Sequence, residues 1–177
     1  SPPPPTLVLT VAPNPVSRPE AILEALQQAL SSPEATGRPV ELVLDAANPE
    51  QIGGTYEMDT ITLNAATTIN ANDGVVTLAN VTDGAGDFGL SLQQAGATGQ
   101  ASIEGSLTVD SLITFNGAYD VELLGGVTVA SDTSFANTTR VQIGDAAGDT
   151  SNFAGGLDTT AVTSTEIAGV VSSGDTQ

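Results

Sequence analysis

Residues 107–123, LTVDSLITFNGAYDVEL, and residues 127–143, VTVASDTSFANTTRVQI, match each other when one segment is shifted by 20 positions. The positions that match best are residues 107–109 with 127–129, Ser111 with Ser131, Phe115 with Phe135, and residues 121–123 with 141–143. Apolar and polar residues alternate within each match, which is the pattern of a β-strand with one buried face. The self-overlap predicts a repeat of about 20 residues with two or three short strands in each unit.

The same skeleton occurs elsewhere in the chain with less regular spacing. Upstream it is found as residues 61–63, Ile69 and residues 76–78, and more loosely from residues 90–92 to Ile103. Residues 42–44 precede residues 61–63 by 19 positions, and we expect them to be the first member of the series. After residue 146 an alternating apolar rhythm continues at Phe153, Leu157, Val162, Ile167 and Val170.

These repeats predict an all-β fold, a parallel β-solenoid or β-helix. Each strand points alternate side chains inward, and a single coil cannot bury that stripe alone. Coils stacked at about 4.8 Å bury it and let each backbone amide bond to the next coil. Turn residues such as Asn116-Gly117, Gly125-Gly126 and Gly155-Gly156 supply the corners. A β-sandwich is the rival fold, but nothing in a sandwich requires the chain to repeat itself. The solenoid requires Val109 to stack on Val129.

The first 50 residues have a different character from the repeats. Residues 1–5 predict an extended polyproline leader, and residues 6–50 predict a strand-helix-strand cap. The strands are expected at residues 6–11 and 39–44. The helix is expected at residues 18–31, because Ser17 and Glu20 form a capping box ahead of a helical apolar stripe. Residues 51–177 then form the solenoid, and the helix would cover the open end of its first coil.

Two segments of the repeat region resemble a known group of proteins. They are TITLNAATTIN at residues 60–70 and VTVASDTSF at residues 127–135. Both are similar to the degenerate repeats of large bacterial surface adhesins, the filamentous-haemagglutinin-like β-solenoid proteins. The resemblance covers about residues 55–173, and it implies a β-solenoid in an adhesin or fibre at a bacterial cell surface.

The composition excludes several classes of function. The chain has no His, Cys, Trp or Lys, and 21 Asp and Glu against 3 Arg give it a net charge of −18. Catalytic triads, His or Cys zinc sites and lysine-dependent phosphate loops therefore lack their residues. We expect no nucleic-acid partner, because so acidic a surface repels phosphates, and no membrane insertion, because no apolar run approaches about 20 residues. An acidic, lysine-free surface rich in Thr, Asn and Gly favours an extracellular location.

Two acidic turns are candidates for calcium, because Ca²⁺ prefers carboxylate and carbonyl oxygens on flexible loops. The candidate ligands are Asp83, Asp87, Asp145 and Asp149. The alternative is that Asp and Gly only form corners there, since the calcium motif of β-rolls recurs in tandem and this one does not. We favour the corner interpretation and expect no cofactor.

Four other aspartates have the spacing to lie on neighbouring coils: Asp110, Asp120, Asp132 and Asp158. Paired carboxylates can hydrolyse glycosides. Such clefts also need aromatic platforms and cations, and from residue 39 onward the sequence holds one cation, Arg140. Solvated surface charge is the better interpretation, and we expect the protein not to be an enzyme.

The C-terminal end of the expected solenoid indicates a function. The last residues contain no helix signal, aromatic plug or proline, so we expect an uncovered end, which is a template for pairing with another chain. We predict an extracellular structural subunit that joins further copies, or further solenoid repeats, into a filament. The residues expected at the contacts are Leu7, Leu9, Val11, Val162, Ile167 and Val170. The alternative is an adhesin or carbohydrate-binding module, with glycans or host-surface components as partners.

Overall fold

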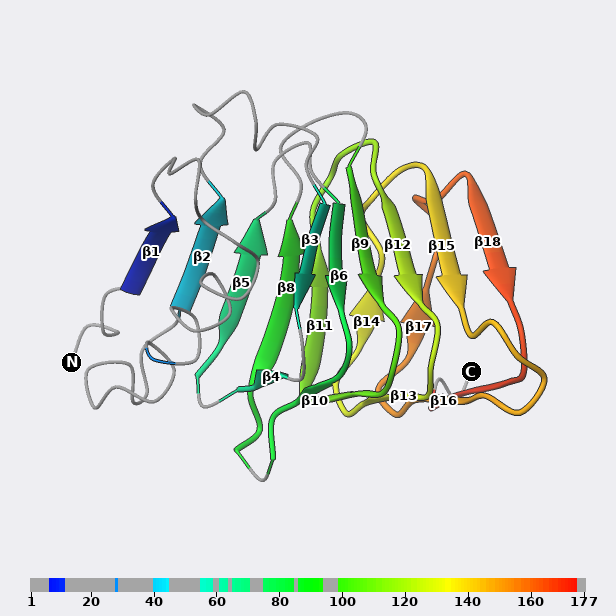
Figure 1. The fold of residues 1–177 in the computed structure, drawn as a ribbon. Helices are drawn as coiled ribbons and strands as arrows, with labels where there is room; N and C mark the ends of the chain where they lie inside the picture. Colours follow the sequence, from blue (N-terminus) through cyan, green and yellow to red (C-terminus); the bar gives the residue numbers. More distant parts are fainter. Residues whose placement is uncertain are drawn as a thin grey trace.

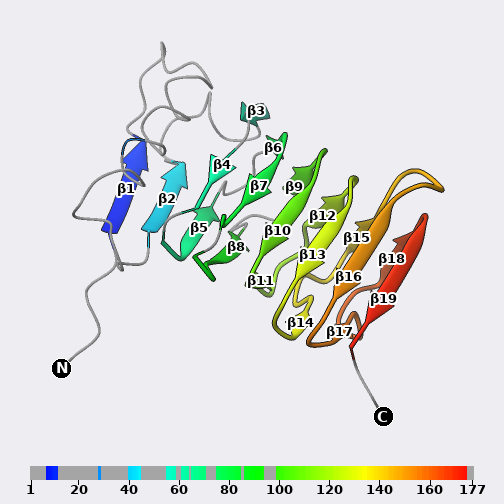
Figure 2. The ribbon, with the colours of Figure 1, turned by 90° about the horizontal axis from the view of Figure 1, so that it is seen from below.

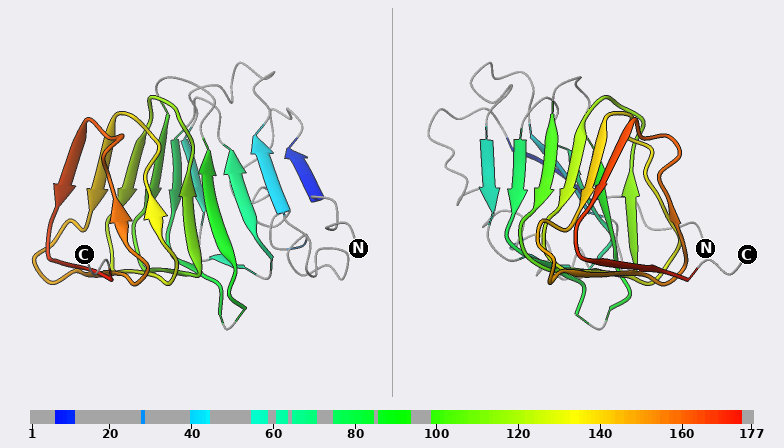
Figure 3. Two further views of the ribbon diagram at one scale, coloured as in Figure 1. Left: turned by 180° about the vertical axis from the view of Figure 1, so that it is seen from behind. Right: turned by 90° about the vertical axis from the view of Figure 1, so that its right-hand side faces the viewer.

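The computed structural model describes residues 7–11, 28, 40–44, 55–58, 61–63, 65–70, 75–84, 86–93 and 99–174. They form a parallel β-solenoid of about five turns, in which every strand pair is parallel (Figure 1). The prediction of an all-β solenoid is confirmed. Figure 3 shows the coils end-on as rough triangles around one narrow interior, and Figure 2 shows them stacked in sequence order.

The strands lie in three faces, A, B and C. Face A contains β1 (Leu7–Val11), β2 (Val40–Leu44), β5 (Thr67–Asn70), β8 (Gly89–Gln93) and β11 (Ser111–Thr114), and continues as β14 (Thr133–Ser134) and β17 (Leu157–Asp158). Face B contains β3 (Thr55–Met58), β6 (Val75–Leu78), β9 (Gln100–Ile103), β12 (Asp120–Leu123), β15 (Arg140–Ile143) and β18 (Ser164–Ile167). Face C contains β4 (Ile61–Thr62), β7 (Val81–Thr82), β10 (Leu107–Val109), β13 (Val127–Val129), β16 (Thr150–Phe153) and β19 (Val170–Ser173).

The shift of 20 residues is the true register between β10 and β13 on face C and between β12 and β15 on face B. Val109 stacks on Val129, and Val121 stacks on Val141, as the repeat requires. The inward position is buried in both coils, while Thr108 and Thr128 between the valines are exposed. Strand alternation thus separates the interior from the surface.

Face A departs from the repeat that the sequence suggests. Phe135 is buried, but Phe115 lies on the surface, 37% exposed, because Leu112 and Thr114 take the inward positions of β11. Tyr119 enters the interior after β11, and its hydroxyl donates to the Leu92 carbonyl oxygen at 2.8 Å. The match of Phe115 with Phe135 therefore does not reflect equivalent places in the coil.

Two of the expected repeat members belong to another face. Residues 42–44 lie in β2 on face A and pair with β5, so the prediction that they are equivalent to residues 61–63 on face C is wrong. Residues 90–92 also lie on face A, in β8, between β5 and β11. An apolar x-φ-x-φ stretch is the same on every face, so the pattern alone does not identify the face.

The interior consists of aliphatic side chains with a few aromatic rings. The largest side chains buried to within 2% exposure are Tyr119, Phe135, Phe153, Ile61, Leu63, Ile69 and Leu78. They belong to one continuous cluster of buried residues. The rows of this cluster run from coil to coil, so each coil buries its apolar stripe against its neighbours.

Glycine is required where coils approach each other at a corner. A Cβ on Gly125 would lie 2.3 Å from the Gly105 carbonyl oxygen of the coil before it. Gly144 has a φ of +76°, and a Cβ there would lie 2.3 Å from the Ala168 carbonyl oxygen of the next coil. Both corners fit the turn function predicted for glycine in the sequence.

Part of the predicted cap lies outside the described residues. The strands expected at residues 6–11 and 39–44 are present as β1 and β2, which pair with each other and with β5. The leader at residues 1–5 and, apart from Gln28, the helix at residues 18–31 fall outside the described ranges.

Alternation predicts opposite outcomes for two neighbouring substitutions on β13. Val129→Thr places an unpaired hydroxyl in the interior and should lower the free energy of unfolding by about 1–3 kcal/mol. Thr128→Val makes the reverse change on the exposed face and should alter it by less than about 0.5 kcal/mol. Urea unfolding of both variants compares them directly. Equal effects would contradict the register of face C.

Candidate functional site

The C-terminal coil ends in three free strand edges. β17, β18 and β19 are each the outermost strand of their face in the described part of the chain. One side of each strand pairs with the preceding coil, as in the pairing of β15 with β18 and of β16 with β19. An outermost strand presents backbone N–H and C=O groups to any further strand that arrives.

Rows of buried side chains, with one residue from each coil, continue into the C-terminal coil and become exposed there. Ile103, Leu123 and Ile143 stack in register and are at most 1% exposed, while Ile167, the next residue of the row, is 57% exposed. Val170, at the start of β19, is 61% exposed. Ile167 is exposed because no described coil follows it, whereas Val170 faces outward, in register with the exposed Thr150 of β16.

The other predicted contact residues are placed as follows. Val162 is half-buried and packs against the core at the same end of the molecule. Leu7, Leu9 and Val11 belong to β1, the outermost strand of face A at the opposite end, where they are in register with Val40, Leu42 and Leu44. The predicted contact residues therefore fall at the two opposite ends of the stack (Figure 1).

Face B carries the main charge cluster of the described residues, centred on Arg140. Its guanidinium lies 3.4 Å from a carboxylate oxygen of Asp120 and 3.4 Å from one of Glu166, and it also forms an ion pair with Glu122. These carboxylates come from β12 and β18, the strands on either side of β15. Arg140 therefore links three successive coils.

The charges of this cluster favour one another. Partial burial opposes the charged guanidinium, but the Glu122 and Asp120 carboxylates outweigh that effect and raise the pKa of Arg140 above its ordinary value. Gln142 accepts a 2.8 Å hydrogen bond from Arg140 and separates Glu122 from Glu166 in the same register row. The row thus avoids placing two carboxylates directly opposite each other.

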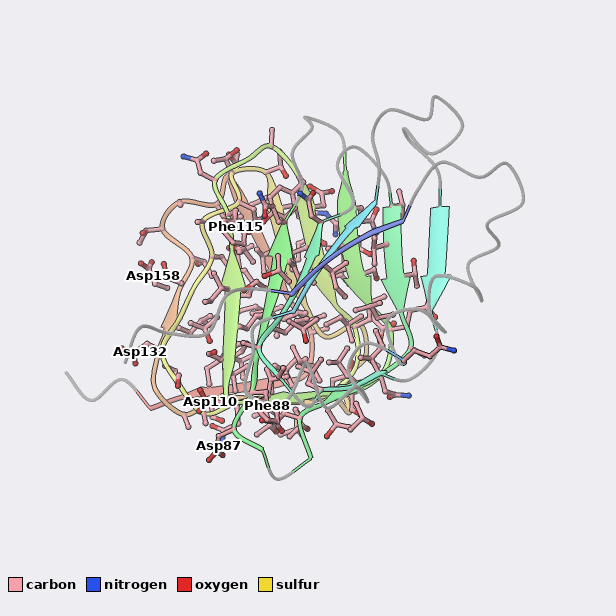
Figure 4. The ribbon with its side chains drawn as sticks, turned by 90° about the vertical axis from the view of Figure 1, so that its left-hand side faces the viewer. Asp87, Phe88, Asp110, Phe115, Asp132 and Asp158 are labelled. Carbon is pink, nitrogen blue, oxygen red and sulfur yellow. The ribbon has the colours of Figure 1, made fainter. Side chains whose placement is uncertain are left out.

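Three of the four aspartates with coil spacing lie along one edge of the molecule. Asp110, Asp132 and Asp158 follow one another on successive coils at the side shared by faces C and A (Figure 4). Asp120 is separated from them on face B, where it accepts from Thr139 and pairs with Arg140. The structure therefore does not bring all four carboxylates to one site.

The aspartates of this edge are bound to neighbouring hydroxyl and backbone groups. Asp110 accepts a hydrogen bond from the Ser131 hydroxyl at 3.3 Å. Asp158 accepts from the Thr160 backbone N–H at 2.8 Å and from the Ser134 hydroxyl at 3.4 Å. The bond from Thr160 favours the ionised form and lowers the pKa of Asp158.

A shallow hollow of about 300 Å³ lies between β14 and β17 on this edge. Its described lining consists of residues 132–134 and residues 155–158. Asp132, Ser134 and Asp158 supply polar groups, and Leu157 is the largest apolar side chain in the lining. The exposed Phe115 of Figure 4 is not among these residues, so the hollow has no aromatic platform in its described lining.

The candidate calcium ligands take part in their own turns. Asp83 is 9% exposed and accepts from the Phe88 backbone N–H at 3.2 Å, while Asp87 is exposed with a φ of +50°. Asp149 accepts from the backbone N–H groups of Asp145 and Ala146 at 2.9 and 2.8 Å. In the described part of the chain, no group of three or more acidic side chains is arranged to hold a metal ion.

The sequence contained a signal for the Arg140 cluster, but the spacing among the aspartates alone did not reveal it. Arg140 follows Asp120 by 20 residues, which is the repeat length, so the two fall on adjacent coils at the same position. The contacts to Glu122 and Glu166 needed the structure, because they depend on side-chain reach across the face.

Neither a family model, nor a curated protein, nor a solved structure matches this chain. Among the described residues, no helix has the length and apolar character needed to cross a bilayer.

Removing the charge of Arg140 should destabilise the C-terminal coils. Arg140→Gln leaves the carboxylates of Asp120, Glu122 and Glu166 without their cation. We expect a loss of about 1–2 kcal/mol at low salt, between the values for exposed and for buried ion pairs, because the Arg140 side chain is 26% exposed. Salt should reduce the loss by screening.

Arg140→Lys is the matched control for this prediction. It keeps the charge but not the planar fork that reaches several carboxylates, so its stability should be intermediate. Urea unfolding at two salt concentrations measures both variants. Wild-type stability of Arg140→Gln at low salt would contradict the predicted cluster.

Asp149 should stabilise the protein in a pH-dependent way. Its two backbone hydrogen bonds lower its pKa below the ordinary value of 3.8. A lowered folded-state pKa contributes stability that is complete above the ordinary value and is lost as the pH falls through the folded value. The stability gap between wild type and Asp149→Ala should therefore be largest near neutral pH and close below pH 3.8.

Thermal unfolding as a function of pH tests this expectation. Asp132→Ala removes an exposed aspartate from another corner and serves as the control for the change in net charge. A gap for Asp149→Ala that stays constant down to acidic pH would show that the carboxylate is not the stabilising group.

Proposed function

We propose that this chain is an extracellular structural protein, a β-solenoid subunit that associates end to end into a filament at a bacterial surface. The proposal assigns it no catalytic role. It draws on the resemblance of residues 55–173 to filamentous-haemagglutinin-like repeats, and on the acidic, cysteine-free composition. Its partners are further copies of the chain or further solenoid repeats.

The observation that carries the proposal is the exposed end of the interior. Ile167 occupies the same row as three residues that are almost completely buried, yet it is 57% exposed. A further coil over β18 and β19 would bury Ile167 and would pair with the outer edges of these two strands. Association thus uses the same hydrogen bonds and apolar contacts that join coils within the chain.

The outermost strands lack the features that commonly prevent edge pairing. Natural edge strands are often protected by Lys, Pro or inward-pointing charges. β18 and β19 contain neither Lys nor Pro, and Glu166, their one charged residue, is bound to Arg140. These edges are therefore suited to pairing with a further strand.

Pairing of unlike ends would give an open filament, whereas pairing of like ends would stop at a dimer. The net charge of −18 opposes both, because copies of the chain repel one another. Salt weakens this repulsion, so the association should be stronger at higher ionic strength.

The alternative function is an adhesin or carbohydrate-binding module that uses the edge near Asp132 and Asp158. The hollow there is polar, but its described lining has no aromatic side chain. Sugar-binding sites commonly combine hydroxyl-binding carboxylates with an aromatic surface. The described contacts therefore favour the structural role.

Electron microscopy and native mass measurement test the proposed function. We expect filaments and a ladder of sizes that shifts to larger species as salt is raised from low to physiological concentration. Ile167→Asp should lower the extent of assembly, because it places a charge where the next coil packs, and Asn116→Asp is the control at an exposed position outside the strands and away from both ends.

Two results would overturn the structural proposal. The first is a monodisperse monomer under all salt conditions. The second is specific binding of the monomer to glycans on an array, lost in Asp132→Asn and Asp158→Asn, which would support the adhesin alternative.

A further inference from the structure

The ends of the stack are stepped on face A, which is one strand short at the C-terminal end and two strands longer at the N-terminal end. Five coils have a strand on each face, from β3–β4–β5 to β15–β16–β17, and β18 and β19 then begin a sixth coil on faces B and C. In the described residues this sixth coil has no strand on face A. At the other end, β1 and β2 extend face A beyond β3 and β4, the first strands of the other two faces (Figure 1).

We propose that β1 of a second copy fills the face A position of the sixth coil by pairing in parallel with β17. This inference rests on the proposed function, because it specifies how copies associate. Among the described strands, β1 and β17 each have no partner on their outer side, so each copy would donate a strand at one end and accept one at the other. Such unlike-end pairing propagates head to tail.

The strand β1 has the composition of a pairing strand. Its residues are LVLTV, without charge and without proline, although the whole chain has 21 acidic residues and 10 prolines. β-branched and aliphatic residues of this kind favour strands. Pro5 before it and Pro13 after it lack the N–H that a sheet needs, so they limit pairing to this short segment.

The direction of the strands agrees with this pairing. β1, β2, β5, β8 and β11 are all parallel, and β14 is parallel to β17. A second copy translated along the solenoid axis therefore presents β1 in the same direction as β17. A copy turned end over end would present it antiparallel, against the pattern of every described sheet.

The register follows from the rows of face A. Val8 is in register with Glu41, Thr68, Ser91 and Ile113 along successive strands. Ile113 is 49% exposed, and Ser134 and Asp158, which are in register with each other, are the exposed residues of β14 and β17. Val8 of one copy should therefore lie beside Asp158 of the next, and Leu7 beside Leu157.

The same placement predicts a gap on the other faces. If β1 occupies the sixth coil, β2 occupies the seventh, and β3, β4 and β5 together occupy the eighth. No described strand of the second copy then pairs with β18 or β19, and Ile167 would be covered across the interior by β1 and β2 from face A. β19 of one copy and β4 of the next are then two strand positions apart, about 9.6 Å. Direct end-to-end stacking would instead place β4 next to β19, with Thr62 beside Ser172 in the row of Thr82, Thr108, Thr128 and Asn152.

Engineered cysteines distinguish the two arrangements, because the chain has no cysteine of its own. A disulfide requires Cα atoms about 4.4–6.8 Å apart, which neighbouring strands satisfy and strands two positions apart do not. The full chain carrying Val8→Cys and Asp158→Cys should form a ladder of disulfide-linked oligomers on a non-reducing gel. The control carrying Thr62→Cys and Ser172→Cys should remain monomeric.

A second cysteine pair controls for disruption of the turn that the Asp158 carboxylate supports. Leu7→Cys with Leu157→Cys leaves the Asp158 carboxylate and its hydrogen bonds to Ser134 and the Thr160 backbone in place. It should give the same ladder. Single-cysteine variants should give no species larger than a dimer, and reductant should return every ladder to monomer.

The outcomes separate this inference from the proposed function. Ladders from the face A pairs alone support the β1–β17 pairing. A ladder from the Thr62 and Ser172 pair, or filaments without any ladder from either face A pair, would overturn it while leaving self-association intact. The absence of both filaments and ladders would overturn the inference and the proposed function together.

Discussion

The structure depends on one constraint: no coil can satisfy its backbone or bury its apolar stripe without the coil next to it. Strands of two to five residues are too short to be stable alone, and each gains its hydrogen bonds only from parallel neighbours 20 to 33 residues away in the chain. Rows such as Val109, Val129 and Phe153 then exclude water along the axis. Stability is therefore a property of neighbouring coils, and the last coil is the place where it is incomplete.

Stacking of equivalent residues would bring like charges together on adjacent coils, and the chain avoids this at individual positions. A strict repeat would set each acidic residue above its equivalent at about 4.8 Å, where like charges destabilise the sheet. On face B, Arg140 stacks next to Asp120, and the neutral Gln142 stands between Glu122 and Glu166. On the acidic edge, Asp110 and Asp158 bind serine hydroxyls of adjacent coils. A chain with a net charge of −18 can thus stack its coils closely.

The strands at the two ends of the stack contain few charged residues. The strands β1 and β19 contain no charged residue, and β17 and β18 contain one each, although acidic residues are frequent elsewhere. A surface that repels other copies more along its sides than at its ends favours association along the axis. This distribution connects the physics that holds coils together within one chain to the assembly proposed between chains.

Several features of the fold and the candidate site could be predicted from the sequence. The self-overlap at 20 residues predicted stacking of Val109 on Val129 and of Val121 on Val141, because a repeat length is also a register when coils stack. Alternation predicted which residues are buried on those strands. The apolar rhythm after residue 146 included Ile167, which lies in the row of Ile143, but it also included Val170, which faces outward.

Only the tertiary structure decided which face each strand joins, and therefore which side chains meet. Residues 42–44 and 61–63 have the same pattern but lie on faces A and C, and Phe115 is exposed where Phe135 is buried. Corner lengths cause these differences, since one added residue in a turn reverses the side that a side chain points to. The sequence by itself determined the repeating strand, its period and its inward stripe, because these depend on neighbouring residues. The stepped ends and the Arg140 cluster depend on how turns of unequal length bring distant residues together, and that is set only when the whole coil closes.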